Sequence, residues 1–392
     1  MQAILATTDV HSALDNAEPL LSHLHHARPT TLIVDCGDFF EGSGYYLLGG
    51  GALERQTLMR LYDVLAPGNH GWRHHLAPDL RALTVCANIN QAGLPVFHPF
   101  RAVDIDGQCV AVTAVLGEQA FACLPADCRS DLTFIPPDQA LHTLANRHRA
   151  DSWVVLSHAG YEHDLKLAAA CPHLDVIFSG HCHSDQYGPT TVGTTVVVKG
   201  RELAEGYAVA APDGAGWRAS VHTFAPSSGV PETLQDIANG IDRIRGRLRA
   251  PLGVLAPRYR HRQLDRSCLL REVADYLLRS GTEAVLLNET SLRTIYLREY
   301  LTVGTLLGIE PFDNQLVTTP LPGTFAGRPH DLLTDLTRWM GPIITAPDPL
   351  PGHLRQVVTT RYVASSFFDT PVLTHGQPFA DVIRHVLRTN RP

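Results

Sequence analysis

Residues 173–185 read HLDVIFSGHCHSD. The apolar run Val176–Phe178 ends in Ser-Gly, and two histidines, His181 and His183, follow with one residue between them. An apolar run without alternation is typical of a strand buried on both faces of a helix-covered sheet. In such sheets, ligands bind beyond the carboxyl ends of the strands. This stretch therefore predicts a buried strand that carries functional histidines at its end.

Similar runs recur through the first 225 residues. They are AILATT (3–8), TLIVDCGD (31–38), YDVLAPGN (62–69), LTVCANI (83–89), CVAVTAVLG (109–117), SWVVLSH (152–158) and TTVVVKG (194–200). Helical patterns stand between some of them, as at 50–62 and 138–149. Strands alternating with helices predict a layered α/β domain over residues 1–225.

A second domain is expected over residues 226–392. The stretch APSSGVPE (225–232) is rich in Pro, Ser and Gly and is interpreted as a linker. Helical patterns follow at 232–248 and 267–281, and strand-like runs at 283–288, 315–321 and 356–365. The second half is therefore expected to be a smaller α/β domain.

Composition excludes several classes of protein. The 392 residues are 44% hydrophobic and carry a formal net charge of -7, so no basic surface for nucleic acid is expected. No run approaches the roughly 20 apolar residues of a membrane span, and MQAILATTDV does not resemble a signal peptide. The eight cysteines form no C-x-x-C pair. A cytoplasmic protein without membrane or nucleic-acid partners is expected, and the oligomeric state stays open.

Five short stretches that follow predicted strands carry metal-ligand side chains. They are Asp9-Val10-His11, Gly37-Asp38, Gly68-Asn69-His70, Ser157-His158-Ala159-Gly160 and Gly180-His181-Cys182-His183. Side chains at i and i+2 of an extended segment point the same way, so Asp9 with His11, and His181 with His183, could each present two ligands to one point.

The ligand types suit two divalent ions. Asp38 could bridge ions roughly 3.5–4 Å apart. Asp9, His11 and His183 would complete the shell of the first ion, and Asn69, His158 and His181 that of the second. Mixed nitrogen and oxygen ligands without thiolate favour Mn²⁺, with Fe, Zn²⁺ or Co²⁺ as alternatives, over Mg²⁺ or Ca²⁺. Two such ions would acidify a shared water and hold a transferring phosphoryl group.

The ordered set DVH, GDFFEGSG, GNH, SHAG and GHCH resembles the calcineurin-like metallophosphoesterase superfamily, in particular its 5'-nucleotidase branch. The resemblance implies a four-layered α/β/β/α catalytic domain (1–225), the same metal ligands, and a C-terminal substrate-binding domain (226–392). His70 would be the histidine that stabilises the phosphoryl transition state. That family usually continues GNHExD, but Gly71 and Arg73 stand at the two acidic positions. Whether another acid orients His70 stays open, and His74 and His75 are expected to lie on the surface.

The second half resembles the 5'-nucleotidase C-terminal domain more loosely. The stretch LLNETSLRT (286–294) implies substrate contacts by Asn288 and Arg293, and IEPFDN and RYVASSFFD imply that Phe312 and Phe368 sandwich a nucleobase. Arg266 is a further candidate phosphate contact.

Two departures from the family affect the predicted substrate. The family's GGDG turn is replaced by TPVLTHGQPF (370–379), and its glycine loop carries Thr290 and Ser291. These changes favour a nucleotide with a modified sugar, or another phosphorylated metabolite, for example in the synthesis of a nucleoside natural product. The leading hypothesis is a dimetal phosphatase acting on a nucleoside 5'-monophosphate or a nucleotide-like metabolite. The alternatives are a cyclic phosphodiesterase, a nucleotide-sugar hydrolase, a sugar-phosphate phosphatase and a non-catalytic nucleotide-binding protein.

Overall fold

The computed structural model describes residues 1–392 except 228, 326–327, 369–373 and 390–392. The chain divides into two compact units, of which the first comprises Met1–Glu41 and Gly49–Arg243 and the second Gly42–Leu48 and Ile244–Pro392. The main division lies inside helix α10 (Gln235–Leu248), beyond the expected boundary at residues 225–226.

The first half of α10 belongs to the first unit for a packing reason. Gly240 lies against Leu53 of helix α3 (Ala52–Leu61), and Arg60 of the same helix forms a salt bridge with Asp236. The residues that follow the Pro/Ser/Gly stretch therefore continue the first unit. The short segment that holds most of helix α2 (Gly44–Gly49) belongs to the second unit, which no sequence pattern indicated.

Two β-sheets form the interior of the first unit. The five-stranded sheet has the order β14-β13-β1-β2-β3, and the six-stranded sheet the order β11-β12-β10-β9-β7-β6. The strands of the first sheet are β1 (Ala3–Thr7), β2 (Thr31–Asp35), β3 (Val64–Leu65), β13 (Gly206–Asp213) and β14 (Gly216–Thr223). Those of the second are β6 (Phe100–Ile105), β7 (Gln108–Leu116), β9 (Ser152–His158), β10 (Val176–Ser179), β11 (Thr190–Val192) and β12 (Thr195–Lys199).

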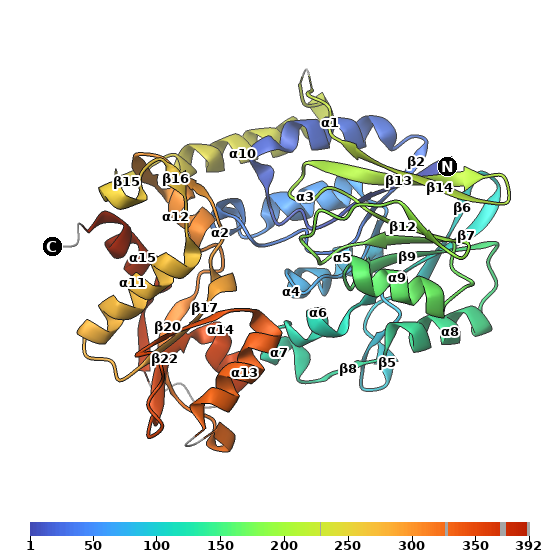
Figure 1. Cartoon of the computed structure of the whole chain (residues 1–392). Coiled ribbons are helices and arrows are strands. Elements are labelled where there is room, and N and C mark those ends of the chain that lie inside the picture. Colours follow the sequence, from blue (N-terminus) through green and yellow to red (C-terminus); the bar gives the residue numbers. More distant parts are fainter. Residues whose placement is uncertain (228, 326–327, 369–373, 390–392) are drawn as a thin grey trace. The chain divides into compact units, whose positions relative to one another are not determined.

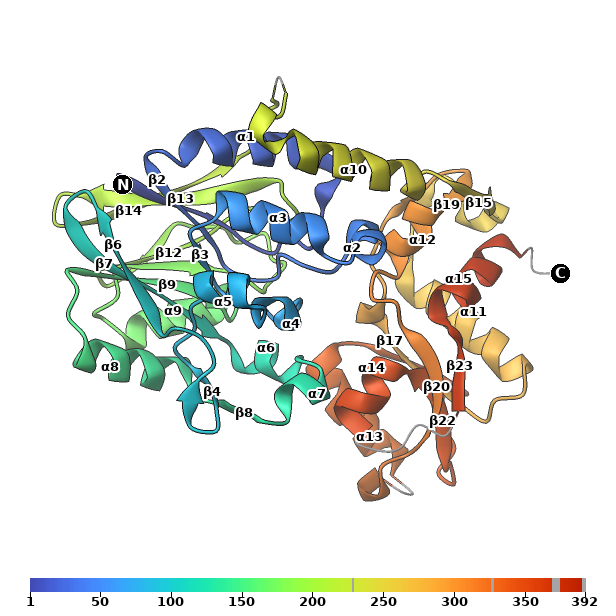
Figure 2. The same ribbon diagram turned by 180° about the vertical axis from the view of Figure 1, so that it is seen from behind.

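Alternate side chains of the two sheets pack against each other. Ile4 and Val34 from the first sheet share one buried cluster with Val112, Leu156 and Phe178 from the second. The opposite face of the six-stranded sheet packs on helices α8 (Pro137–Arg147) and α9 (Tyr161–Ala170). Helices α1 (Ala17–Ala27) and α3 cover the other outer face, as Figures 1 and 2 show. This is the expected four-layered α/β/β/α domain.

Shorter elements complete the first unit. They are helices α4 (Trp72–His75), α5 (Pro78–Leu83), α6 (Glu118–Ala122) and α7 (Ala126–Arg129), and a small sheet of β4 (Ile89–Gln91), β5 (Leu94–Pro95) and β8 (Leu132–Phe134).

The second unit is built on one five-stranded sheet of order β21-β17-β22-β20-β23. Its strands are β17 (Val285–Asn288), β20 (Gln315–Pro320), β21 (Ile343–Ala346), β22 (Gln356–Thr360) and β23 (Thr374–Pro378). Helices α11 (Arg266–Arg279), α12 (Val303–Ile309) and α15 (Phe379–Arg388) share a core with one face. Helices α13 (Pro329–Met340) and α14 (Arg361–Val363) share a core with the other. The second half is therefore an α/β unit, as expected.

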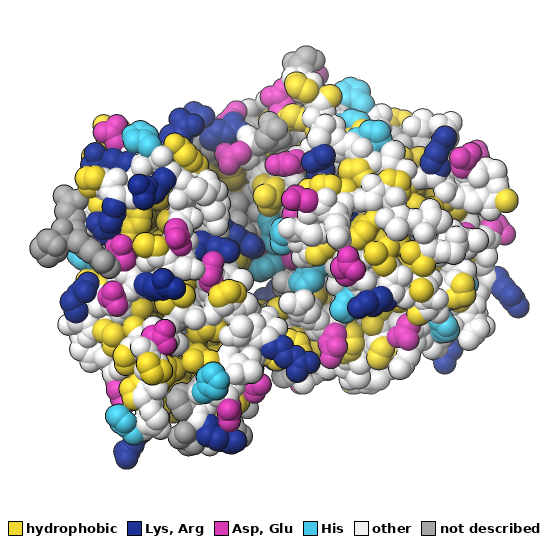
Figure 3. All heavy atoms as spheres, viewed as in Figure 1, with side chains coloured by type: hydrophobic (Ala, Val, Ile, Leu, Met, Phe, Trp, Pro, Cys, Tyr) yellow, Lys and Arg dark blue, Asp and Glu magenta, His cyan; other side chains and the backbone are white. Residues whose placement is uncertain are grey.

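Two-stranded ladders flank this sheet, formed by β15 (Pro251–Val254) with β19 (Tyr300–Thr302) and by β16 (Arg262–Gln263) with β18 (Tyr296–Leu297). Basic and acidic side chains are interspersed on the face of each unit visible in Figure 3. Among the described residues, no helix combines the length and apolar character that crossing a bilayer would need.

Candidate metal centre

Two groups of parallel strands deliver the predicted ligands. Strands β1, β2 and β3 are parallel neighbours, and Asp9, Asp38 and Asn69 follow their carboxyl ends. In the other sheet β9 and β10 are parallel neighbours; His158 is the last residue of β9, and His181 follows β10. The side chains gather because parallel strands place these loops at one edge of each sheet.

The backbone of these loops is unusual. Asp9, His11, Asp38 and His181 have left-handed φ angles of 49°, 48°, 56° and 75°. A non-glycine residue in this region costs about 1–3 kcal/mol and persists only where its surroundings hold it. Gly68 is required by a close approach, since a Cβ there would lie 1.9 Å from Asp38 Oδ1.

The possible ligand atoms form three groups of three residues, and two of these groups correspond to the predicted shells of the two ions. Asp9, His11 and His183 offer atoms within 4.8 Å of one another, and so do Asp38, His158 and His181. His181 and His183 lie in different groups, as in the proposed assignment to two ions, although alternation alone would have let both face one point. The alternation rule applies to extended backbone, and His181 has a left-handed φ.

Asp38 links the two groups, because it also belongs to a third group with His11 and His70. Its Oδ2 is 3.8 Å from His11 Nε2 and 3.2 Å from His158 Nε2. Asn69 Oδ1 is 3.3 Å from the same nitrogen of His158. The Nδ1 of His158 is 2.9 Å from the carbonyl oxygen of Cys36, to which it can donate, so its Nε2 is turned toward the cluster. Asp38 is thus placed as a bridging ligand would be.

Burial and mutual charge shift the pKa values in this cluster. Burial would raise the pKa of Asp38, but the imidazoles of His158 and His70 hold it well below its usual range. Burial would lower the pKa of His158, but Asp38 raises it to about 9. Burial, assisted by His158, lowers the pKa of His181 to about 3, while burial raises that of Asp9. Asp38 and His158 therefore stabilise each other's charged forms, and a divalent cation bound there would compete with this interaction.

The donor set fits divalent transition metals. Buried carboxylates, imidazoles and one amide oxygen converge, and no cysteine is in either group among the described residues. Such nitrogen and oxygen donors suit Mn²⁺, Fe, Co²⁺ or Zn²⁺. The assignment of all seven residues as ligands remains our proposal.

The missing acidic partner of His70 is Glu41. His70 Nδ1 lies 3.0 Å from Glu41 Oε2, and the backbone N–H of Gly71 donates to the other carboxylate oxygen at 3.0 Å. The backbone N–H of His70 donates to Asp38 Oδ1 at 2.8 Å, which ties the histidine to the metal cluster. The sequence signal was present in GDFFEGSG, three residues after Asp38. Arg73, at the position where the family has an aspartate, pairs with Asp127 on the surface instead.

The prediction that His74 and His75 lie on the surface is wrong for His75. This side chain is buried, its Nδ1 lies 3.0 Å from Thr84 Oγ1, and burial lowers its pKa to about 3. His74 is partly buried, and its ring stacks on Phe40 with centroids 4.2 Å apart. Both side chains serve packing, which a single sequence does not distinguish from exposure.

The predicted substrate contacts lie in the second unit, and four of them share one neighbourhood. Asn288 ends β17, and its Nδ2 donates to Thr290 Oγ1 at 2.9 Å. The Arg293 guanidinium lies 5.3 Å from the ring centroid of Phe312. Arg266 is paired with Glu289 at 3.1 Å and donates weakly to the carbonyl of Leu292.

Phe368 is placed differently. Its side chain is 3% exposed and belongs to a core cluster with Leu286 and Val363. A ring in that position would have to leave the core before it could stack on a base. Residues 370–373 of the replaced stretch TPVLTHGQPF lie outside the described residues.

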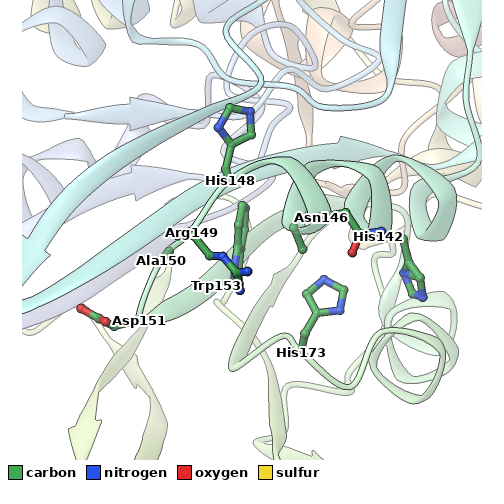
Figure 4. Close-up of a pocket in the computed structure, with 9 residues that line it drawn as sticks. His142, Asn146, His148, Arg149, Ala150, Asp151, Trp153 and His173 are labelled. Carbon is green, nitrogen blue, oxygen red and sulfur yellow. The ribbon is translucent and has the colours of Figure 1, made fainter.

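A separate hollow of about 380 Å³ occurs in the first unit, and Figure 4 shows its lining. His142, Asn146, Trp153 and His173 surround it, and no predicted site residue is among the described residues that line it. It is therefore distinct from the metal cluster.

The fold and the ligand cluster together define a metallophosphoesterase domain. Residues 3–185 match the family model for calcineurin-like phosphoesterases, so the first unit carries a calcineurin-like phosphoesterase domain. This is a domain class of metal-dependent phosphoester hydrolases.

Two curated proteins resemble part of the chain. The trifunctional nucleotide phosphoesterase protein YfkN of Bacillus subtilis is 23% identical over 229 residues, which are 46% of this chain and 16% of that protein. A human 5'-nucleotidase is 23% identical over 223 residues, which are 47% of this chain and 38% of that protein. The matches thus span well under half the length of either relative.

Solved structures match nearly the whole chain. A 5'-nucleotidase precursor from Thermus thermophilus superimposes with a TM-score of 0.74 and 18% identity, covering 99% of this chain and 96% of that one. A sulfate thiohydrolase from the same organism, SoxB, gives 0.75 and 16%, covering 100% and 95%. The chain therefore has the two-domain fold of 5'-nucleotidases, a fold that also supports other hydrolytic chemistry.

Proposed function

We propose that this chain is a dimetal phosphatase that hydrolyses the phosphomonoester of a nucleoside 5'-monophosphate or of a nucleotide-like metabolite with an altered sugar. The observation that carries the proposal is the set of ligand groups linked by Asp38, together with the pairing of His70 with Glu41. The names of the relatives, a nucleotide phosphoesterase and a 5'-nucleotidase, support the substrate class.

The cluster would position a substrate phosphate through fixed groups. When bound, the two metal ions would supply an acidified water and positive charge near the phosphoryl oxygens. His70 would direct its Nε2 toward the transferring phosphoryl group, because Nδ1 is engaged by Glu41. A fixed donor of this kind stabilises the charge of the transition state. Glu41 is a positioning residue that fixes the tautomer of His70.

Substrate recognition is proposed for the loops of the second unit. Arg293 offers a planar set of donors suited to phosphate, and the partly exposed ring of Phe312 offers a face for a base. Asn288 Oδ1 is buried and has no hydrogen-bond partner among the described residues, so it could accept from a substrate. Arg266 could bind the substrate phosphate only if it first gave up its salt bridge with Glu289. We restrict base stacking to Phe312, because Phe368 is packed in the core.

The alternatives differ in the leaving group. A cyclic phosphodiesterase, a nucleotide-sugar hydrolase and a sugar-phosphate phosphatase would each use the same metal cluster. A non-catalytic nucleotide-binding protein would not need His70 to be held by Glu41.

The test is phosphate release from the purified, Mn²⁺-loaded protein across nucleoside 5'-monophosphates, cyclic nucleotides, sugar phosphates and nucleotide sugars, with Asn69→Ala as the blank. A coupled phosphatase in parallel reactions would detect diester and nucleotide-sugar cleavage, which releases no free phosphate. Release from nucleoside monophosphates that Asn69→Ala lacks is the expected result. Release from sugar phosphates alone would discard the base-stacking proposal and keep the metal chemistry. Two bound metals with no turnover of any compound would contradict the nucleotidase proposal.

A further inference from the structure

Lys199 is a buried lysine next to the metal cluster. It ends β12, which pairs with β10 so that Lys199 lies beside Ser179. Its side chain is fully buried, and its Nζ donates to the carbonyl oxygens of Cys182 and Ser184, both at 2.7 Å. These two carbonyls flank His183. The third partner of Nζ is the carboxylate of Glu202.

Glu202 holds the side chain of His183. Its Oε2 lies 2.8 Å from His183 Nδ1, which can donate to it, and this leaves His183 Nε2 for a metal. The other carboxylate oxygen of Glu202 pairs with Lys199 Nζ, so Glu202 joins His183 to the buried lysine. His183 has 40% of its side chain exposed and needs such an anchor more than the buried ligands do.

The same turn also holds a second ligand. The backbone N–H of Leu203, the residue after Glu202, donates to the carbonyl oxygen of Asp9 at 3.0 Å. Leu203 and Ala204 have left-handed φ angles of 52° and 58°, so the turn keeps a costly backbone shape. The segment of Glu202 and Leu203 therefore contacts two members of this ligand group, His183 and Asp9.

The choice of lysine is itself informative. Only two lysines, Lys166 and Lys199, occur among the 32 basic residues of the chain. A buried charge is costly unless it is paired and hydrogen-bonded, and an apolar residue in its place often stabilises a protein as well or better. A buried lysine with three acceptors is therefore better explained by the geometry that it imposes on the loop of His183.

We propose that Lys199 and Glu202 are positioning residues that set the metal affinity of the Asp9, His11 and His183 position, independently of the Asp38, His158 and His181 position. Lys199 fixes the backbone on both sides of His183, and Glu202 fixes its ring and tautomer. Outer-shell partners of this kind typically contribute about 10–100-fold in metal affinity. The inference rests on the metal ligands of the proposed function and on no particular substrate.

The experiment is a Mn²⁺ titration of the full chain, followed by electron paramagnetic resonance and calorimetry, in wild type, Lys199→Met and Glu202→Gln. Lys166→Met, at the exposed second lysine on α9, is the matched control. We expect wild type and Lys166→Met to bind two Mn²⁺ per chain. Each of the other two variants should lose about 10–100-fold in affinity at one position and keep the other unchanged. Glu202→Gln preserves volume and carries the test if circular dichroism shows Lys199→Met to be unfolded.

A double-mutant cycle assigns the affected position. Adding Lys199→Met to His183→Ala should cause little further loss, because the ligand that Lys199 positions is already gone. Unchanged affinities in the folded variants, or equal losses at both positions, would overturn the proposal. Wild-type protein that binds no metal would instead overturn the proposed function itself.

Discussion

The two units of this chain differ in how their candidate residues are held. In the first unit, the seven predicted ligands come together from the ends of five strands, and most are buried. In the second unit, the predicted substrate contacts come from a strand end, helices and loops, and some are engaged by neighbours, as Arg266 is by Glu289. The candidate ligands of the first unit are thus held by buried strand ends, whereas the candidate contacts of the second unit share no such common frame.

The largest expected effect is on the shared carboxylate of the first unit. Asp38→Asn removes the charge between the two ligand groups, so we expect phosphate release to fall by about 10³-fold or more on every substrate. Metal content by mass spectrometry should fall in parallel. Asp79→Asn, which changes an exposed carboxylate paired with Arg55, is the control and should behave as wild type. Normal turnover with Asp38→Asn would remove the basis for a dimetal centre.

The His70–Glu41 pair should give the next largest effect. His70→Asn should lower kcat by about 10²–10³-fold while both metals remain bound, because a transition-state donor is lost. Glu41→Gln should lower kcat by about tenfold or more and change its pH profile. Asp127→Asn, which breaks only the surface pair with Arg73, should leave both unchanged. A Glu41→Gln enzyme with wild-type kcat and pH profile would show that Glu41 does not position His70.

The two phenylalanines sharpen the comparison within the second unit. Phe368→Ala empties part of a core, so stability should fall by about 3–5 kcal/mol and the melting temperature by about 10 °C. Phe312→Ala removes a partly exposed ring, so melting should hardly change while KM for the nucleotide rises about tenfold or more. Thermal melts and initial rates of both variants show which of the two rings contacts the substrate. The reverse pattern would restore Phe368 as the stacking residue.

The smallest effect concerns Glu310, which shapes the loop of Phe312. Its Oε1 accepts from the backbone N–H groups of Phe312 and Asn314, and burial raises its pKa to about 7. Because the folded pKa is above the ordinary value of 4.5, the native state binds the proton more tightly. The group's contribution to stability is therefore complete below pH 4.5 and is lost as the pH rises through 7.

Glu310→Gln should cancel this loss. The stability of the variant minus that of wild type should be larger at pH 8 than at pH 5, by roughly 2–3 kcal/mol. Thermal melts of both proteins at the two pH values measure this difference. A difference between Glu310→Gln and wild type that does not vary with pH would exclude a raised pKa at Glu310.

Local sequence motifs predicted the fold class correctly, but they predicted the placement of some individual residues and not of others. Apolar runs that end in Gly-Asp, Gly-Asn-His or Gly-His-x-His indicate both the strands and the ligands, because parallel strands bring such ends together. His75 was misjudged because one polar residue in a helical turn can be buried with a local partner, here Thr84. The compact units divide inside α10 and not at the Pro/Ser/Gly stretch, because Gly240 packs on Leu53 of the first unit.

The sequence by itself determined the layered α/β architecture, the seven candidate ligands and their division between two positions. Only the tertiary structure decided which side chains support them. Glu41 orients His70 across 29 positions of sequence, and Lys199 with Glu202 holds His183 from the end of another strand. The physical reason is that ligand types follow from local chemistry, whereas a supporting hydrogen bond needs only an oxygen or nitrogen within about 3 Å. Many residues can supply such an atom, and long-range packing selects the one that does.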